Sequence, residues 1–217
     1  IAGRAAHFRG VQGTAIVGIL GVTAGTTGAS EKGLRRAGIS EYGVVYLHPG
    51  HHAGYYPGAH PIHIKLIFSL GDGRILGAQA VGEEGVDKRL DVIATMIQMR
   101  GSVHDLAEAE LCYAPQYGSA KDPVNVAGMM ACNALRGDMP LADWGALGCT
   151  KPYLLDVREP DEFAKGHMEG ATNLPLSQLR KREAEVPRDR QVWVYCAAGQ
   201  RAYFAQRLLR QRGVDAL

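Results

Sequence analysis

A short apolar run that stops at a cysteine, with a helical pattern directly after it, constrains this chain more than any other stretch. The run Val192–Tyr195 consists of β-branched and aromatic residues, which predicts a buried strand. Apolar side chains then recur at helical spacing from Ala202 to Leu209, with arginines between them. Cys196 therefore opens a strand-to-helix loop that is closed by Arg201, where free backbone N–H groups and the positive end of a helix dipole favour a thiolate and bind anions. A buried structural cysteine is the alternative interpretation.

Two stretches upstream extend this pattern. Leu154–Phe163 contains a buried strand that ends in Asp-x-Arg and a Glu-Pro-Asp-Glu turn that starts a short helix. Gly166–Leu176 then runs as a Gly-His-x-x-Gly-Ala-x-Asn-x-Pro loop toward the next strand. Together with Cys-x-x-Gly-x-Arg between strand and helix, these stretches resemble the rhodanese sulfurtransferases. The resemblance implies a small α/β domain whose cysteine carries sulfur as a persulfide.

The rhodanese resemblance also assigns roles to single residues. Cys196 is expected to be the nucleophile, and Arg201 is expected to fix the loop. The backbone N–H groups expected to hold the anionic leaving group or persulfide belong to Ala197, Ala198, Gly199 and Gln200. Asp156 and Arg158 are expected to support the loops around the site. His167 could serve as a catalytic base, but in the family this histidine is a structural loop residue, and we expect that role here.

Composition and charge exclude several classes of protein. With 217 residues, 46% of them hydrophobic, and a formal net charge of +2, the chain is long enough for one large or two small soluble domains. Residues 150–217 carry 12 Lys+Arg and 9 Asp+Glu, and residues 1–149 carry 12 and 13, so neither part predicts a nucleic-acid partner. No apolar run approaches the ~20 residues that cross a bilayer, and no signal peptide opens the chain, so we expect a cytoplasmic protein without a membrane partner. The four cysteines form no Cys-x-x-Cys pair, which predicts free thiols.

The preceding part of the chain carries both strand and helix signals. Apolar runs predict strands at Gly13–Leu20, which we expect to be buried, Tyr42–Leu47, Ile62–Phe68 and Ile75–Val81. Periodicity and capping residues predict helices at Glu31–Ala37 after Ser30, at Asp87–Met99, after Ser102, and from Asp122–Pro123 to about Arg136. The last two strands, joined by the turn Gly71–Gly73, form an antiparallel hairpin. These signals predict an α+β domain, an antiparallel sheet with helices on one side.

Several motifs in this part resemble a single family. They are the loop His52–Gly58, the segment Gly85–Asp91, the tyrosine segment Tyr113–Tyr117 and the segment Ala120–Asn125. They resemble the carboxy-terminal dimerisation domain of coenzyme A disulfide reductases, in the FAD-dependent pyridine nucleotide-disulfide oxidoreductase family. We therefore expect a dimerisation domain over residues 1–137 and a rhodanese-like domain, truncated at its carboxy terminus, over residues 138–217.

This second resemblance implies a homodimer in which tyrosines reach the partner subunit's flavin site. Tyr113 and Tyr56 are expected to be catalytic by hydrogen-bonding or protonating a coenzyme A thiolate, and Tyr117 is expected to bind substrate. Packing tyrosines with satisfied hydroxyls are the alternative. The resemblance implies FAD and NAD(P)H as cofactors of the intact enzyme, with coenzyme A as substrate. Because the sequence has no Gly-x-Gly-x-x-Gly turn, starts at Ile1 and stops at Leu217, we expect a fragment without the two nucleotide-binding domains.

The two resemblances together imply one sulfur chemistry. We expect the intact protein to reduce a coenzyme A disulfide, persulfide or polysulfide with NAD(P)H, coupled to sulfur transfer through a Cys196 persulfide. Two alternatives stay open. One is a non-catalytic dimerisation and binding module, and the other is the carboxy-terminal part of an NADH oxidase or peroxidase, which shares the fold of the first domain.

The remaining histidines and cysteines are expected to have structural roles. Five histidines stand close together in the sequence, at His48, His51, His52, His60 and His63. No cysteine or acidic residue lies near them at ligand spacing, so we expect no metal. Cys112 has no helix dipole or positive neighbour and Cys132 lies on a helical apolar pattern, so both are expected to be buried and inert. Cys149, in the linker Met139–Pro152, is expected to be exposed.

Overall fold

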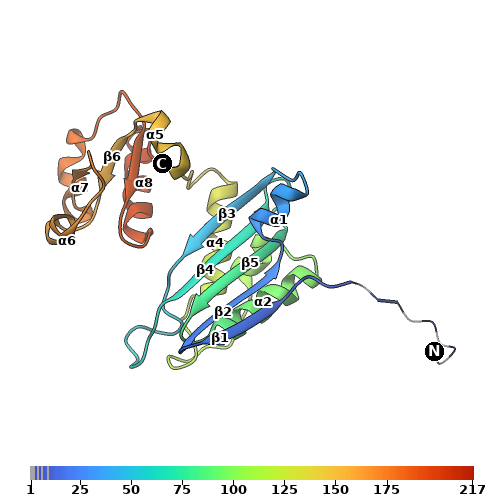
Figure 1. Cartoon of the computed structure of the whole chain (residues 1–217). Coiled ribbons are helices and arrows are strands. Elements are labelled where there is room, and N and C mark those ends of the chain that lie inside the picture. The colour runs from blue at the N-terminus through green and yellow to red at the C-terminus, as the bar shows by residue number, and fades with distance from the viewer. Residues whose placement is uncertain (1–2, 4, 6, 9) are drawn as a thin grey trace. The chain divides into compact units, whose positions relative to one another are not determined.

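The computed structural model describes residues 1–217 with the exception of residues 1, 2, 4, 6 and 9. The chain divides into two compact units, Ile1–Cys132 and Asn133–Leu217 (Figure 1), and each is described by itself. The domain boundary predicted between residues 137 and 138 stays a prediction.

The first unit is built on a five-stranded antiparallel sheet with the strand order β1-β2-β5-β4-β3 (Figure 1). The strands are β1 (Ala15–Ile19), β2 (Val22–Gly28), β3 (Tyr42–Leu47), β4 (Ile62–Ser69) and β5 (Ile75–Gly82). β4 and β5 form the predicted hairpin, in which Ile64 lies opposite Ala80 and both side chains are buried. The hairpin and β3 are therefore confirmed.

The beginning of this sheet differs from the prediction. The strand expected to be buried at Gly13–Leu20 is β1, and all its residues are exposed because β1 is an edge strand that pairs with β2 alone. β2 is not predicted, since its sequence Val-Thr-Ala-Gly-Thr-Thr-Gly shows no apolar alternation. Its glycines have a packing role. A Cβ on Gly25 would lie 2.4 Å from Cδ1 of Leu90, on helix α2 (Val86–Gln98), so only glycine lets the helix approach this strand.

The helices begin where the capping residues predict. α1 (Glu31–Arg36) starts after Ser30, whose Oγ accepts a hydrogen bond from the Gly33 N–H, and α3 (Val103–Glu108) starts after Ser102 in a capping box with Asp105. α2 and α4 (Pro123–Leu135) lie behind the sheet in the view of Figure 1 and cover one face of it. The predicted α+β architecture is confirmed.

The second unit is a small α/β domain with a parallel sheet. Its strands β6 (Tyr153–Asp156), β7 (Thr172–Asn173) and β8 (Val192–Tyr195) are arranged in the order β7-β6-β8. Its helices are η1 (Trp144–Ala146), α5 (Leu147–Thr150), α6 (Pro160–Lys165), α7 (Leu176–Arg182), η2 (Glu183–Glu185) and α8 (Gln200–Gln211). Asp156 pairs in register with Asn173 on one side and with Tyr195 on the other, so the loops after all three strands leave the same edge of the sheet. Ligand-binding loops of parallel sheets lie at this edge.

The segment Met139–Pro152 is more than the predicted linker. It contains η1 and α5, and the Trp144 ring packs edge-on against Trp193 and Tyr195 with centroid distances of 5.3 Å and 6.2 Å. The sequence pattern did not indicate this contact, because it joins this segment to a strand far along the chain. None of the helices in the described part of the chain is long and apolar enough to cross a membrane.

Candidate active site

The Cys196 thiol lies directly after β8, at the carboxyl edge of the parallel sheet. The sulfur accepts hydrogen bonds from two backbone amides, from Gly199 N at 3.1 Å and from Ala202 N at 3.4 Å. Gly199 adopts a left-handed conformation with φ of 88°, which turns the loop into the first residue of α8. Two amides at the amino end of a helix stabilise a sulfur anion. The thiol is partly buried, and the loop residues Ala197, Ala198, Gly199 and Gln200 are exposed to solvent.

Arg201 joins the thiol loop to helix α6. Its guanidinium donates to both carboxylate oxygens of Glu162, at 2.5 Å and 2.8 Å, and Glu162 also accepts from the Glu159 N–H in the capping box of α6. Hydrogen bonds from Arg201, and then from the Glu159 backbone, lower the pKa of Glu162 to about 2. The same pair, with a smaller contribution from Cys196, raises the pKa of Arg201. The sequence predicted Arg201 as the residue that fixes the loop, but it did not identify Glu162 as its partner.

Asp156 and Arg158 support the same edge of the sheet. The Asp156 side chain is fully buried, and Arg158 donates to it through Nε at 2.9 Å and Nη2 at 2.6 Å. Burial opposes ionisation of Asp156, but the hydrogen bonds from Arg158 outweigh it and lower the pKa of Asp156. Arg158 also donates to the Gly166 carbonyl at 2.7 Å, and the Tyr195 hydroxyl accepts from the Met168 N–H at 3.2 Å. These bonds hold the loop after α6 against the end of β8.

His167 lies in this supporting loop. Its ring stacks on Phe163 with a centroid distance of 3.7 Å, and its Nδ1 lies 3.0 Å from the Phe163 carbonyl oxygen. Both contacts tie the histidine to α6, which agrees with the structural role that we expect for it.

A pair of phenols forms the second candidate site, in the first unit. The Tyr55 and Tyr113 hydroxyls lie 2.8 Å apart, and the hydrogen bond between them raises the pKa of Tyr113. Both side chains are exposed, Tyr55 by 77% and Tyr113 by 49%, so a ligand can reach the hydroxyls. Tyr56, which the sequence selects, packs edge-on against His52 instead, and Tyr117 lies exposed on the same segment as Tyr113. Tyr55 and Tyr56 are adjacent, and no sequence pattern distinguishes them. Only the fold identifies Tyr55 as the partner of Tyr113.

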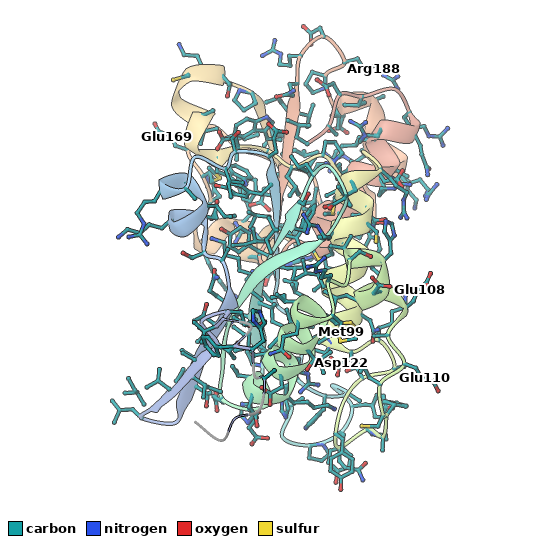
Figure 2. All side chains as sticks on the ribbon, turned by 90° about the vertical axis from the view of Figure 1, so that its right-hand side faces the viewer. Met99, Glu108, Glu110, Asp122, Glu169 and Arg188 are labelled. Atoms are coloured by element: carbon teal, nitrogen blue, oxygen red, sulfur yellow. The ribbon has the colours of Figure 1, made fainter. Side chains whose placement is uncertain are left out.

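The two segments that carry these tyrosines rest on a buried ion pair. Arg89 of α2 donates to the Asp122 carboxylate at 2.8 Å and to the His51 carbonyl at 2.5 Å, and both charged side chains are almost completely buried (Figure 2 labels Asp122). The Ala53 N–H, in the loop of Tyr55, donates to the Gly118 carbonyl at 2.9 Å, in the segment of Tyr113. The position of the two phenols therefore depends on both α2 and the start of α4.

The other predicted residues have mixed outcomes. Cys132 is buried and Cys149 is exposed, as expected, but the prediction for Cys112 is wrong, since it is exposed. It lies in a segment without helix or strand, where an apolar-pattern argument does not apply. The Cys132 sulfur lies 3.3 Å from Nδ1 of His104.

Two of the five histidines lie beside acidic residues that are distant from them in the sequence. His51 and His60 lie 3.3 Å and 3.2 Å from carboxylate oxygens of Glu84 and Glu83, in the turn after β5. His48 and His63 face each other, with their Nδ1 atoms 2.7 Å apart. Among the described residues, no three His, Cys, Asp or Glu side chains are grouped so that they could hold a metal ion.

Comparison with known proteins agrees with both units. Residues 14–122 match the pyridine nucleotide-disulphide oxidoreductase dimerisation domain, and residues 142–217 match the rhodanese-like domain. A coenzyme A disulfide reductase of Staphylococcus epidermidis is 37% identical over 125 residues, which are 58% of this chain and 28% of that protein.

Two solved structures resemble nearly the whole chain. Reduced Bacillus anthracis CoADR-RHD is 44% identical, with a TM-score of 0.93, over 96% of this chain and 38% of that chain. An NAD-dependent persulfide reductase from A. fulgidus is 36% identical, with a TM-score of 0.89, over 99% of this chain and 39% of that chain. The chain thus spans well under half the length of the relatives that it matches. Since the dimerisation-domain match covers half of its residues, the chain belongs to the pyridine nucleotide-disulphide oxidoreductase dimerisation-domain family and carries a rhodanese-like domain after it.

Proposed function

We propose that the intact protein is a flavoprotein that reduces a coenzyme A disulfide, persulfide or polysulfide with NAD(P)H, coupled to sulfur transfer through Cys196. The observation that carries the sulfur-transfer part is the Cys196 sulfur itself, which receives two backbone N–H bonds at the amino end of α8. The names of the similar proteins, a coenzyme A disulfide reductase and a persulfide reductase, support the reductase part.

The sulfur-transfer step follows from the loop geometry. The Cys196 thiolate attacks the outer sulfur of a persulfide R–S–S⁻, forming one S–S bond as the bond to the inner sulfur breaks. The electron pair of the broken bond leaves as the thiolate R–S⁻, and the enzyme holds Cys–S–S⁻. The backbone N–H groups of the loop, from Ala197 to Arg201, then stabilise the new anion in the place of the old one. Charge is conserved, with two negative charges before the step and two after it.

The phenol pair is assigned to the reductase part. A thiolate that leaves a coenzyme A disulfide gains a proton or a hydrogen bond, and an exposed phenol can supply either one. In the Tyr55–Tyr113 pair, the hydrogen bond that raises the pKa of Tyr113 keeps this phenol protonated over a wider pH range. We therefore assign the proton-donating role to these two tyrosines, and Tyr56 becomes the comparison residue.

The sheet of the first unit does not match the sheet that binds a dinucleotide. The sheet of the first unit is antiparallel, whereas the dinucleotide fingerprint requires a parallel strand followed by a glycine-rich turn and a helix. We assign FAD and NAD(P)H, which would supply the reducing electrons, to the part of the intact protein outside this chain.

We also propose that the intact protein is a cytoplasmic homodimer. The exposed edge strand β1 supports a partner surface, because its apolar side chains Ile16, Val17 and Ile19 are each more than half exposed. Sedimentation at tens of micromolar tests this, and a folded monomer at that concentration would contradict it.

The direct test of the sulfur-transfer proposal is mass spectrometry of the folded chain. After brief exposure to coenzyme A persulfide or thiosulfate, the Cys196 peptide should gain the mass of one sulfur atom, which a reducing agent removes. Cys112 and Cys149 are exposed thiols in the same molecule and serve as internal controls. If Cys112 and Cys149 gain sulfur as fast as Cys196, the thiol of Cys196 has no special reactivity. The proposal would then be rejected in favour of a non-catalytic binding module.

A further inference from the structure

A groove with an apolar floor and basic ends runs along the second unit, between α7 and α8. One hollow of about 290 Å³ is lined by Leu176, Arg180, Phe204, Arg207, Leu208 and Gln211. A second hollow, of about 450 Å³, shares Arg207 and Gln211 with it and extends past Arg210. The two hollows are thus neighbours along α8.

Three α8 residues that line the groove belong to a row of side chains that begins at the thiol loop. Gln200, Phe204, Arg207 and Gln211 follow each other at intervals of three or four residues, which places them in one row along α8. Gln200 belongs to the loop after Cys196, and seven residues of helix put Arg207 about 10 Å further along. A ligand in the groove therefore lies along the helix whose amino end carries the thiol loop.

The charges of the groove are only partly neutralised. Arg207 forms an ion pair with Asp138 at 2.9 Å. Arg180 and Arg210 are exposed and have no carboxylate within ion-pair distance in the described part of the chain. Asp215 lines the outer hollow, where its carboxylate accepts a hydrogen bond from Gln191 Nε2 at 3.2 Å. Arg210 donates one hydrogen bond to the Ala216 carbonyl, at 3.5 Å. Because neither Arg180 nor Arg210 faces a carboxylate among the described residues, both guanidiniums favour an anion.

The apolar part of the groove favours an aromatic ring. Phe204 is 51% exposed, although it lies on a helix whose neighbouring residues Ala205 and Leu209 are fully buried. An exposed aromatic face between arginines suits stacking of a planar base. Anionic groups beside a planar ring are the chemistry of a phosphorylated nucleoside.

We propose that this groove binds the adenosine 3′,5′-bisphosphate end of coenzyme A and thereby presents a coenzyme A persulfide to Cys196. The base stacks on Phe204, the phosphates lie at Arg180 and Arg210, and the pantetheine arm runs back along α8 to the thiol loop. This site rests on the proposed function, because it assumes that the sulfur donor is a coenzyme A persulfide. Its binding step can be tested without that assumption.

The first experiment titrates the folded chain with adenosine 3′,5′-bisphosphate by calorimetry. We expect saturable binding that weakens as salt is added, and weaker or no binding of adenosine alone and of pyrophosphate alone. Arg180→Gln and Arg210→Gln should each raise Kd about tenfold, since each removes a charge-assisted contact. Both residues are exposed, so the variants should fold.

Lys181→Gln is the matched control. It removes one positive charge from the neighbouring position of α7, and Lys181 does not line either hollow. The proposal is overturned if the nucleotide does not bind saturably, or if Lys181→Gln weakens binding as much as Arg180→Gln.

The second experiment separates the site from the sulfur chemistry. With coenzyme A persulfide as donor, Arg180→Gln should raise KM about tenfold with little change in kcat, whereas KM for thiosulfate should not change because thiosulfate is too small to reach the groove. An unchanged KM for coenzyme A persulfide would reject the groove and leave the proposed function intact. Nucleotide binding without any sulfur transfer to Cys196 would reject the proposed function and leave the groove intact.

Discussion

The two candidate sites of this chain are assembled in opposite ways. At the thiol site, the sulfur of Cys196 and the amides that bond it, Gly199 and Ala202, belong to one short stretch of sequence. At the phenol site, Tyr55 and Tyr113 are 58 positions apart, and their segments are joined by the Ala53–Gly118 hydrogen bond and rest on the buried Arg89–Asp122 pair. A site made by one strand-to-helix turn is visible in a sequence pattern. A site made by two irregular segments depends on the packing beneath them.

This difference predicts how each site responds to mutation. The thiol site should tolerate changes elsewhere in the fold and fail when its own residue is removed. The phenol site should be sensitive to residues that never touch a substrate. The following predictions test these expectations in order of the size of the expected effect.

The largest effect is expected from Cys196→Ala. Sulfur transfer from thiosulfate or a persulfide should be lost, because no other group in that loop can form the S–S bond. In the full-length enzyme, reduction of a simple disulfide should continue, since the phenol pair belongs to the other unit. Rates of thiocyanate formation and of NAD(P)H oxidation measure the two activities. Loss of both together would mean that the sites are not independent.

The next largest effect is expected from Arg89→Met, which leaves the Asp122 carboxylate buried without its partner. Breaking a buried ion pair in this way costs about 3–5 kcal/mol, so the free energy of unfolding of the first unit should fall by that amount. Urea unfolding followed by circular dichroism measures it.

Lys88→Met is the control for the buried pair. Lys88 precedes Arg89 in α2, and its ammonium donates to the Tyr117 carbonyl at 3.3 Å in a solvent-exposed hydrogen bond. We expect a change of less than about 0.5 kcal/mol for this variant. Equal losses in the two variants would show that the pair has no special role beneath the tyrosines.

A smaller but more specific effect is expected from Tyr55→Phe and Tyr113→Phe. Each should slow reduction of a coenzyme A disulfide by the full-length enzyme roughly a hundredfold, the usual contribution of a positioned proton donor, without changing sulfur transfer at Cys196. Tyr56→Phe is the matched control and should have little effect, since its ring contacts His52. If Tyr56→Phe is the damaging change, the residue chosen from sequence is right and the geometric choice is wrong. A change in thermal stability without a change in rate would identify packing tyrosines.

The smallest effect concerns acid stability at the thiol site. The pKa of Glu162 is lowered to about 2 in the folded chain from an ordinary value of 4.5, so the pair with Arg201 contributes its full stability above about pH 4.5 and loses it as the pH falls toward 2. Glu162→Gln should therefore be less stable than the wild type at neutral pH, and the gap should close as the pH falls through this range. Urea midpoints at a series of pH values measure the gap. A gap that stays constant with pH would show that the carboxylate charge is not what Arg201 binds.

The sequence by itself determined the features that depend on neighbours along the chain. These include the β4–β5 hairpin, the Ser30 and Ser102 caps, the strands β6 and β8, and the position of Cys196 between strand and helix. Each arises from periodicity, capping or turn chemistry, which act over a few residues. Even at the thiol site, however, the sequence did not identify Glu162, because that carboxylate is 39 positions from Arg201.

Only the tertiary structure decided which of two adjacent tyrosines pairs with Tyr113, that β1 is an exposed edge, and that Cys112 is exposed. It also decided that histidines without acidic neighbours in sequence meet Glu83 and Glu84. The physical reason is the same in each case. Burial and side-chain pairing depend on which distant segments pack together, and an irregular segment such as the loop of Tyr55 has no periodicity from which its orientation could be predicted.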